Sequence, residues 1–159
     1  VFFTDKHIDS KTIGFFFSVP VVVAMLIGGL VGGFLSDKMS RKKSVTVFLC
    51  GFVFIIISIA LVGFVYPSAS HFLLLTLFAW MYFFIGMFTT SSYALFMDAT
   101  NPKLGATEFS TFMAATNACE SWAVWLTGIL VVSFSYSSAF LIMSVVSLLS
   151  LFFLRKIKI

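Results

Sequence analysis

One acidic residue in this sequence lies inside a long apolar run, and its carboxyl group is the first candidate for chemistry. Glu120 lies about 13 residues into the run from 107 to 134, which is roughly 20 Å along a helix. Thr116 and Asn117 lie one turn earlier, on the same face. In a low-dielectric environment such a carboxyl group can load and release a proton, or contact a polar ligand. A structural Glu, hydrogen-bonded to a neighbouring helix, is the alternative that the sequence leaves open.

The composition indicates what kind of element holds this carboxyl group. Of the 159 residues, 60% are hydrophobic, 18% are aromatic and 10% are charged. A soluble domain usually has about 25% charged residues, so the surplus apolar surface must face lipid. The net charge of +4 is divided among short clusters between the apolar runs, and does not form the basic face that nucleic-acid binding needs.

Five apolar runs are each long enough to cross a bilayer, which takes about 20 residues. Short polar links join them, so neighbouring helices must be antiparallel. The sequence therefore predicts an all-α, polytopic membrane bundle of about five transmembrane helices, in one membrane domain over residues 1–159. Because the chain begins with Val1, we expect it to lack an N-terminal part. The five predicted helices are Thr12–Leu35, Ser44–Tyr66, Phe72–Met97, Thr107–Phe134 and Ser137–Leu154.

Lys and Arg residues are distributed unequally between the two sides of this bundle. Eight of them lie in the link 36–43, the link 98–106 and the C-terminal tail, whereas the other side has only Lys6 and Lys11. By the positive-inside rule, both links and the C-terminus should be cytoplasmic. The expected location is an inner membrane.

The first cytoplasmic link contains an aspartate among cations: Gly33-Phe34-Leu35-Ser36-Asp37-Lys38-Met39-Ser40-Arg41-Lys42-Lys43. Asp37 can pair with Arg41 and accept hydrogen bonds from a neighbouring helix N-terminus, which would latch one conformation. Gly33 would let another helix approach closely. The alternative is a topology signal with an incidental aspartate, although aspartate contributes little to the positive-inside rule.

This link resembles the signature G-x-L-[GAS]-[DN]-[RK]-x-G-R-[RK]-[RK] of the major facilitator superfamily, with Ser40 in place of the usual glycine. In that family the signature joins the second and third helices of a six-helix half. The resemblance implies a secondary transporter that works by alternating access of two halves. The basic tail favours helices 8–12 of 12, and the N-terminal half is the alternative.

The second cytoplasmic link runs from Asp98 through Asn101-Pro102 to Thr107-Glu108. Pro102 should end the preceding helix, Thr107 should cap the next one, and Glu108 should lie in its first turn. Asp98 should pair with Lys103 or with cations of the first link. The stretch resembles D-x-[TS]-x-P-x-x-x-A-T-[QE]-[FY] of AmpG muropeptide permeases and acetyl-coenzyme A transporters. This resemblance implies proton-driven import of cell-wall sugar-peptides, with gating or coupling at this inner-face junction.

The other apolar runs predict how the helices are arranged. Residues 44–66 and 137–154 contain no Asp, Glu, Lys, Arg or His side chain, so these helices should be outer ones in contact with lipid. Ser91 and Ser92 should line a cavity, although hydroxyl groups can also bond their own helix. Two overlapping GxxxG spacings at residues 28–33 predict close helix packing within the chain, and Pro20 should kink its helix.

Several function classes lack the residues they need. No Cys or His spacing fits a metal site, and no cofactor is expected. An intramembrane enzyme would need a nucleophile and base, or metal ligands, at membrane depth. The expected partners are a small-molecule substrate, protons, the lipid bilayer and the missing helices of the same transporter. A carrier of another solute (acyl-CoA, sugar or siderophore) and a non-transporting scaffold or sensor remain alternatives.

Overall fold

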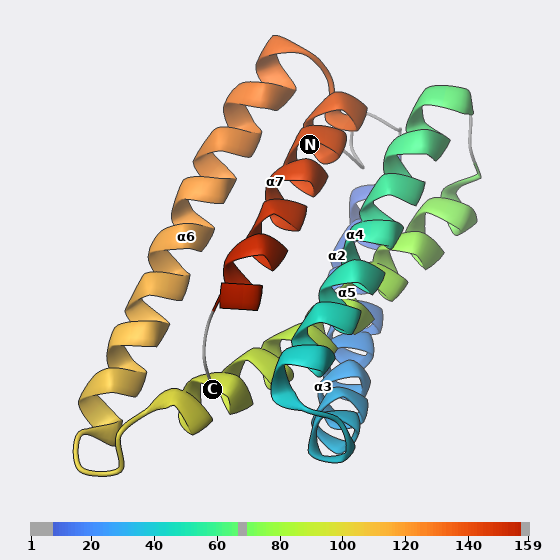
Figure 1. The fold of residues 1–159 in the computed structure, drawn as a ribbon. Helices are drawn as coiled ribbons and strands as arrows, with labels where there is room; N and C mark the ends of the chain where they lie inside the picture. The colour runs from blue at the N-terminus through green and yellow to red at the C-terminus, as the bar shows by residue number, and fades with distance from the viewer. Residues whose placement is uncertain (1–7, 67–69, 157–159) are drawn as a thin grey trace.

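The fold is a bundle of long helices joined by short links (Figure 1). The computed structural model describes residues 8–66 and 70–156, and these contain no strand. The all-α prediction is therefore confirmed. Lys6 and Lys158, which entered the charge count, lie outside the described residues. The helices are α2 Ser10–Ser18, α3 Pro20–Lys38, α4 Arg41–Val65, α5 His71–Ala99, α6 Gly105–Ser133 and α7 Tyr136–Lys156.

The first predicted span is divided into α2 and α3. Val19 has φ −121° and ψ −68°, and Pro20 is the first residue of α3. Proline has no N–H and fits the first turn of a helix, so the sequence allows a break at this point. The kink predicted at Pro20 is confirmed. Together the two segments still form one candidate span, Ser10–Lys38.

Helices α3 and α5 pack through their backbones. A Cβ atom at Gly28 would collide with the carbonyl oxygen of Phe83, and one at Gly32 would lie 2.5 Å from the Cα of Met87. In return, a Cβ at Gly86 would collide with the carbonyl oxygen of Met25. The close packing predicted from the GxxxG spacings is confirmed. Gly33 contributes less than expected, since its Cβ would reach only a methyl group of Thr90, at 3.4 Å.

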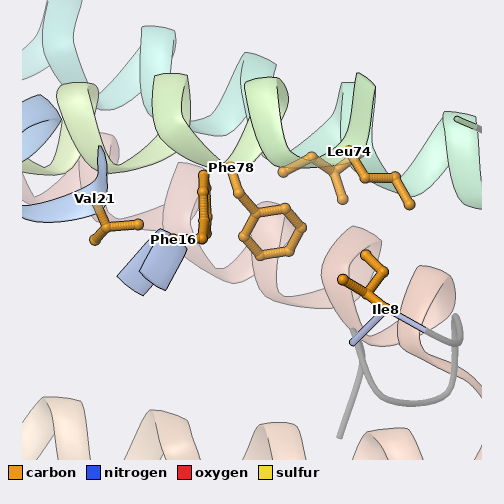
Figure 2. Close-up of a cluster of buried hydrophobic side chains, with 6 residues drawn as sticks. Ile8, Phe16, Val21, Leu74 and Phe78 are labelled. Carbon is orange, nitrogen blue, oxygen red and sulfur yellow. The ribbon is translucent and has the colours of Figure 1, made fainter. Parts of the chain in front are cut away.

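The main hydrophobic cluster lies at the end of the bundle opposite the α3–α4 turn. Figure 2 shows Phe16 of α2 and Phe78 of α5 beside Leu74, with Ile8 and Val21 at the two sides. Ile59 of α4 completes the cluster. Burial of these apolar side chains holds the divided first span against α4 and α5.

Helix α4 is more buried than the sequence predicts for an outer helix. Eight of its residues are buried, more than in any other described helix. One face packs against α5 and α7, and Gly63 contacts the side chain of Ser137. The opposite face exposes Phe54 and Leu61. The absence of Asp, Glu, Lys, Arg and His from residues 44–66 therefore predicts one lipid-facing side, but not a peripheral position.

Within residues 8–66 and 70–156, four helical spans are long and apolar enough to cross a membrane, and α6 is not among them. They are Ser10–Lys38, Arg41–Val65, His71–Ala99 and Tyr136–Lys156. With 29 residues α6 has the required length, so its polar side chains lower its hydropathy. Figure 1 shows the α3–α4 turn, the α5–α6 link and the end of α7 at the same end of the bundle. The alternation of helix directions predicted from the short links is therefore confirmed.

Candidate functional site

Arg41 joins two helix ends at the α3–α4 turn. It lies in the first turn of α4, because that helix begins three residues earlier than predicted. Its Nη1 lies 2.9 Å from Oδ1 of Asp37, at the end of α3. Its Nε lies 2.9 Å from Oδ2 of Asp98, in the last turn of α5. The guanidinium group therefore bridges two carboxylates from different helices.

The same guanidinium group also satisfies the end of α3. Its Nη1 donates to the carbonyl oxygen of Ser36 at 3.1 Å and approaches the Ser36 hydroxyl at 3.4 Å. Ser36 is 1% exposed, and Arg41 is 30% exposed. One planar cation thus binds a carbonyl and two carboxylates, which fits the forked donor geometry of arginine. We call Asp37, Arg41 and Asp98 the charge triad.

The structure resolves the alternatives for Asp98. Asp98 pairs with Arg41, whereas Lys103 uses its backbone N–H to bond the side chain of Asn101, at 3.0 Å. The predicted pairing of Asp37 with Arg41 is also present. The two other basic residues of the motif are placed differently: Lys38 lies over the ring of Phe34, 4.2 Å from its centroid, and Lys42 is half-buried.

The α5–α6 link differs from the prediction at its capping residue. Helix α5 ends at Ala99 before Asn101-Pro102, as expected from the proline. Thr107 does not cap α6, so this prediction is wrong. The helix begins at Gly105 and its N-cap position is Leu104, without a side-chain hydrogen bond. Glu108 lies in the first turn, as predicted, but its Oε2 accepts a hydrogen bond from the backbone N–H of Asn101, at 2.7 Å.

Glu120 lies on the exposed part of α6. Within residues 8–66 and 70–156, neither a hydrogen bond nor an ion pair involves its carboxyl group, so the structural alternative finds no partner there. Asn117 is also exposed. Thr116 is half-buried and donates its hydroxyl proton to the Phe112 carbonyl, at 2.9 Å, in its own helix. The carboxyl and amide groups are therefore the polar groups that this face leaves open.

Ser91 and Ser92 are not at an open cavity. Their exposed fractions are 0% and 9%, so the predicted cavity lining is wrong for this pair. The α3–α5 contacts join residues 55 apart, 28 with 83 and 32 with 87, and the same offset places Ser91 opposite the buried Ser36. Thr89 and Thr90, which precede the pair, instead line a hollow of about 540 Å³ with Gly29 and Gly86. The Ser/Thr run is therefore divided between a packed face and an open one.

The family model of the Major Facilitator Superfamily matches residues 1–158. The chain belongs to this superfamily. A Rickettsia bellii (strain RML369-C) protein named "Putative transporter AmpG 1" is 29% identical over 143 residues. The match covers 86% of this chain and 33% of that relative, so the chain spans about a third of the relative's length. No solved structure gives a significant match.

Membership of the Major Facilitator Superfamily confirms the family suggested by the link at residues 36–43. The similarity to the Rickettsia bellii protein agrees with the AmpG resemblance of the link at residues 98–106. The chain is an integral membrane protein of a transporter family, with a sequence and helix content that fit a partial bundle. This family assignment favours a non-enzyme. Among the described residues, no group of three His, Cys, Asp or Glu side chains could hold a metal ion.

Two residues that contribute hydrogen bonds to the candidate site, Ser36 and Asn101, were not identified from the sequence. Ser36 accepts from Arg41, which could have been expected only from the exact turn geometry. Asn101 bonds both Lys103 and Glu108, and its position before Pro102 was the available signal. Both contacts involve backbone atoms, which side-chain patterns do not reveal.

Proposed function

We propose that this chain is part of a secondary transporter that works by alternating access and is driven by protons. Glu120 is the observation that carries the proposal. It is an exposed carboxyl group near the middle of a 29-residue helix in a membrane-protein family, and it has no partner within the described residues. A charge at this depth costs a few kcal/mol unless water or a partner reaches it. A hydrated passage beside α6 would supply that environment.

In this proposal Glu120 binds and releases the coupling proton, and Asn117 lies one turn away to contact the proton-bearing group or the substrate. The hollow beside Thr89 and Thr90 offers hydroxyl groups on the adjacent helix. The substrate class that the AmpG resemblance favours is a cell-wall sugar-peptide. The five spans would then be helices 8–12 of a twelve-helix protein, in an inner membrane, with the α3–α4 turn, the α5–α6 link and the C-terminus in the cytoplasm.

The test uses the complete protein in proteoliposomes with a pH gradient and a labelled sugar-peptide. Glu120→Gln should lower proton-driven uptake at least about tenfold, because one proton-binding group of the coupling pathway is removed. Exchange of labelled for unlabelled substrate without a gradient should persist, since substrate binding does not need the proton carrier. Loss of both activities would assign Glu120 to substrate contact instead.

Unchanged uptake of Glu120→Gln at every pH would exclude Glu120 as the coupling group. Saturable uptake of acyl-CoA, a sugar or a siderophore, but not of the sugar-peptide, would change the substrate class. Absence of saturable uptake of all four would favour a scaffold or sensor.

The charge triad has a separate role in the proposal, as a latch on the cytoplasmic side. Arg41 holds the ends of α3 and α5 together through Asp37 and Asp98, and charge-assisted hydrogen bonds of this kind are stronger than neutral ones. Opening of that side would have to break at least one of them. Gly33, Lys38 and Lys42 belong to the same motif and would adjust the packing and charge around the latch.

Asp37→Ala should slow transport about threefold to tenfold while leaving substrate binding intact, because the latch stabilises one conformation without contacting the substrate. Lys103→Ala is the matched control, since it removes a charge on the same side from a side chain outside the triad. Wild-type transport kinetics in Asp37→Ala would contradict the latch.

A further inference from the structure

We infer that Glu108 is a positioning residue that ties the start of α6 to the end of α5, so that α6 follows the state of the charge triad. This inference rests on the proposed latch, and adds the path by which the latch would reach Glu120. The contact that defines it is the 2.7 Å hydrogen bond from the Asn101 N–H to Oε2 of Glu108.

The link between the two helices is closed by this contact. The Asn101 carbonyl oxygen accepts from the Leu104 N–H at 2.9 Å, and the Asn101 side-chain oxygen accepts from the Lys103 N–H at 3.0 Å. Glu108 adds a third bond, from seven residues further along the chain. The link therefore forms one compact turn in which Asn101 connects both flanking segments.

Aromatic contacts hold the same region of both helices. Phe96 of α5 stacks on Phe112 of α6, with centroids 5.2 Å apart and planes at 26°. Tyr93 meets Phe109 edge to face, with centroids 6.3 Å apart. Both pairs join the last two turns of α5 to the first two turns of α6. Aromatic pairs of this type contribute beyond the apolar area that they bury.

Further along, the side-chain hydrogen bonds of α6 stay within the helix. The hydroxyl groups of Thr116, Ser121 and Thr127 donate to carbonyl oxygens of α6 itself, and the helix has no buried residue. Helix α6 also packs against α7, more extensively than against α5. Glu108 and the aromatic pairs thus fix the start of α6 relative to α5, and a movement of that start changes the tilt of α6 about its contact with α7.

The charge triad ends three residues before this tie. Asp98 pairs with Arg41, and Asn101 then bonds Glu108. Glu120 lies twelve residues beyond Glu108, or about 18 Å along the helix. Movement of the α5 end when the triad opens would therefore tilt α6 and displace Glu120. Without the Glu108 contact, only the aromatic pairs and the link itself would couple the two events, and the coupling would be weaker.

The competing explanation is that Glu108 acts only through its charge near the helix N-terminus. Two conservative variants separate the explanations. Glu108→Gln keeps an oxygen at the right reach but loses the charge, whereas Glu108→Asp keeps the charge but shortens the side chain. A positioning role predicts that Gln retains the contact and Asp loses it, and a charge role predicts the reverse.

The experiment measures a distance distribution between spin labels in the complete protein. One label replaces Val47 on α4 and the other replaces Val132 near the far end of α6, because both side chains are exposed. Cys50 and Cys119 are first replaced by serine. Glu108→Ala and Glu108→Asp should raise the population outside the wild-type distance range about fivefold, because neither side chain can accept the hydrogen bond from the Asn101 N–H. Glu108→Gln and the control Ser110→Ala should match the wild type.

A wild-type distribution in both Glu108→Ala and Glu108→Asp would overturn the inference, and so would a defect in Glu108→Gln with a normal Glu108→Asp. Arg41→Ala separates this result from the latch. If Arg41→Ala slows transport but Glu108→Ala leaves the distribution unchanged, the tie is wrong and the latch stands. If Glu108→Ala broadens the distribution but Arg41→Ala changes neither readout, Glu108 holds the two helices together but α6 does not follow the charge triad, which overturns the inference together with the latch.

Discussion

Helices α5 and α6 each have 29 residues and follow one another in the chain, yet they are held in opposite ways. Helix α5 has seven buried residues and packs against α3 and α4. Helix α6 has none, and it exposes Trp122, Trp125 and Val132 together with Glu120. Helix α5 is therefore held by contacts with other helices of this chain, whereas most of the surface of α6 is left uncovered by this chain.

The difference follows from the residues at the contacts. Helix α5 meets α3 where glycines on both helices remove the side chains that would separate them. The two glycines of α6, Gly105 and Gly128, have no neighbouring atom within 4 Å of the position that a Cβ would take. A glycine thus produces a close contact only where the main chain of a neighbouring helix lies against it. This comparison can be tested from both sides.

The largest effect should come from filling the α3–α5 contact. Gly28→Leu should destabilise the complete protein by about 3 kcal/mol or more, since the side chain would collide with backbone that cannot move aside. Gly128→Leu, the matched change on α6, should have a much smaller effect. Unfolding in mixed detergent micelles with increasing SDS measures both variants. Equal destabilisation would mean that α6 is as closely packed as α5.

A buried hydroxyl group on α5 provides the next test. The Oγ of Ser91 is buried and is the one described side-chain atom of that kind without a hydrogen-bond partner. Ser91→Ala should therefore stabilise the protein by about 1 kcal/mol, because an unsatisfied polar group is removed. Ser121→Ala on α6 should change stability by less than about 0.5 kcal/mol, since this serine is exposed. The same unfolding assay applies, and a loss of stability in Ser91→Ala would indicate an unseen partner.

The smallest effect concerns the two carboxylates. Asp98→Asn should destabilise by about 0.5 kcal/mol, because its pair with Arg41 is partly exposed. Glu120→Gln should not destabilise, because no described residue depends on that charge. A stability loss in Glu120→Gln larger than in Asp98→Asn would reveal a structural ion pair and contradict its assignment to proton coupling.

The helices could be predicted because hydrophobicity and chain breaks determine them directly. All five expected spans correspond to helices, and the break at Pro20 and the end of α5 before Pro102 were expected. The predictions failed where neighbours decide the outcome. Burial of α4 and of Ser91 depends on which helices lie beside them, and Thr107 lost its capping role because Gly105 and Ala106 extended the helix.

In the candidate site, the contacts between charged side chains could be predicted, whereas those with backbone atoms could not. The pairing of Asp37 and Asp98 with Arg41 followed from opposite charges on one side of the bundle. The bonds to the Ser36 carbonyl and from the Asn101 N–H did not, because every residue carries these backbone groups. The roles proposed for Glu120 and the triad remain predictions that the transport assays address, and the roles of Asn117 and Pro102 remain predictions.

The α3–α5 contact also determines where this protein can tolerate mutation. At residues 83 and 87 it is the main chain that touches the glycines, and every residue type presents the same main-chain atoms. Positions 83 and 87 can thus vary in side chain without disturbing the contact, whereas 28 and 32 cannot exceed a hydrogen atom. Sequence drift at this interface is therefore excluded at the glycines of both helices, 28 and 32 on α3 and 86 on α5, and allowed at the positions where only the main chain makes the contact.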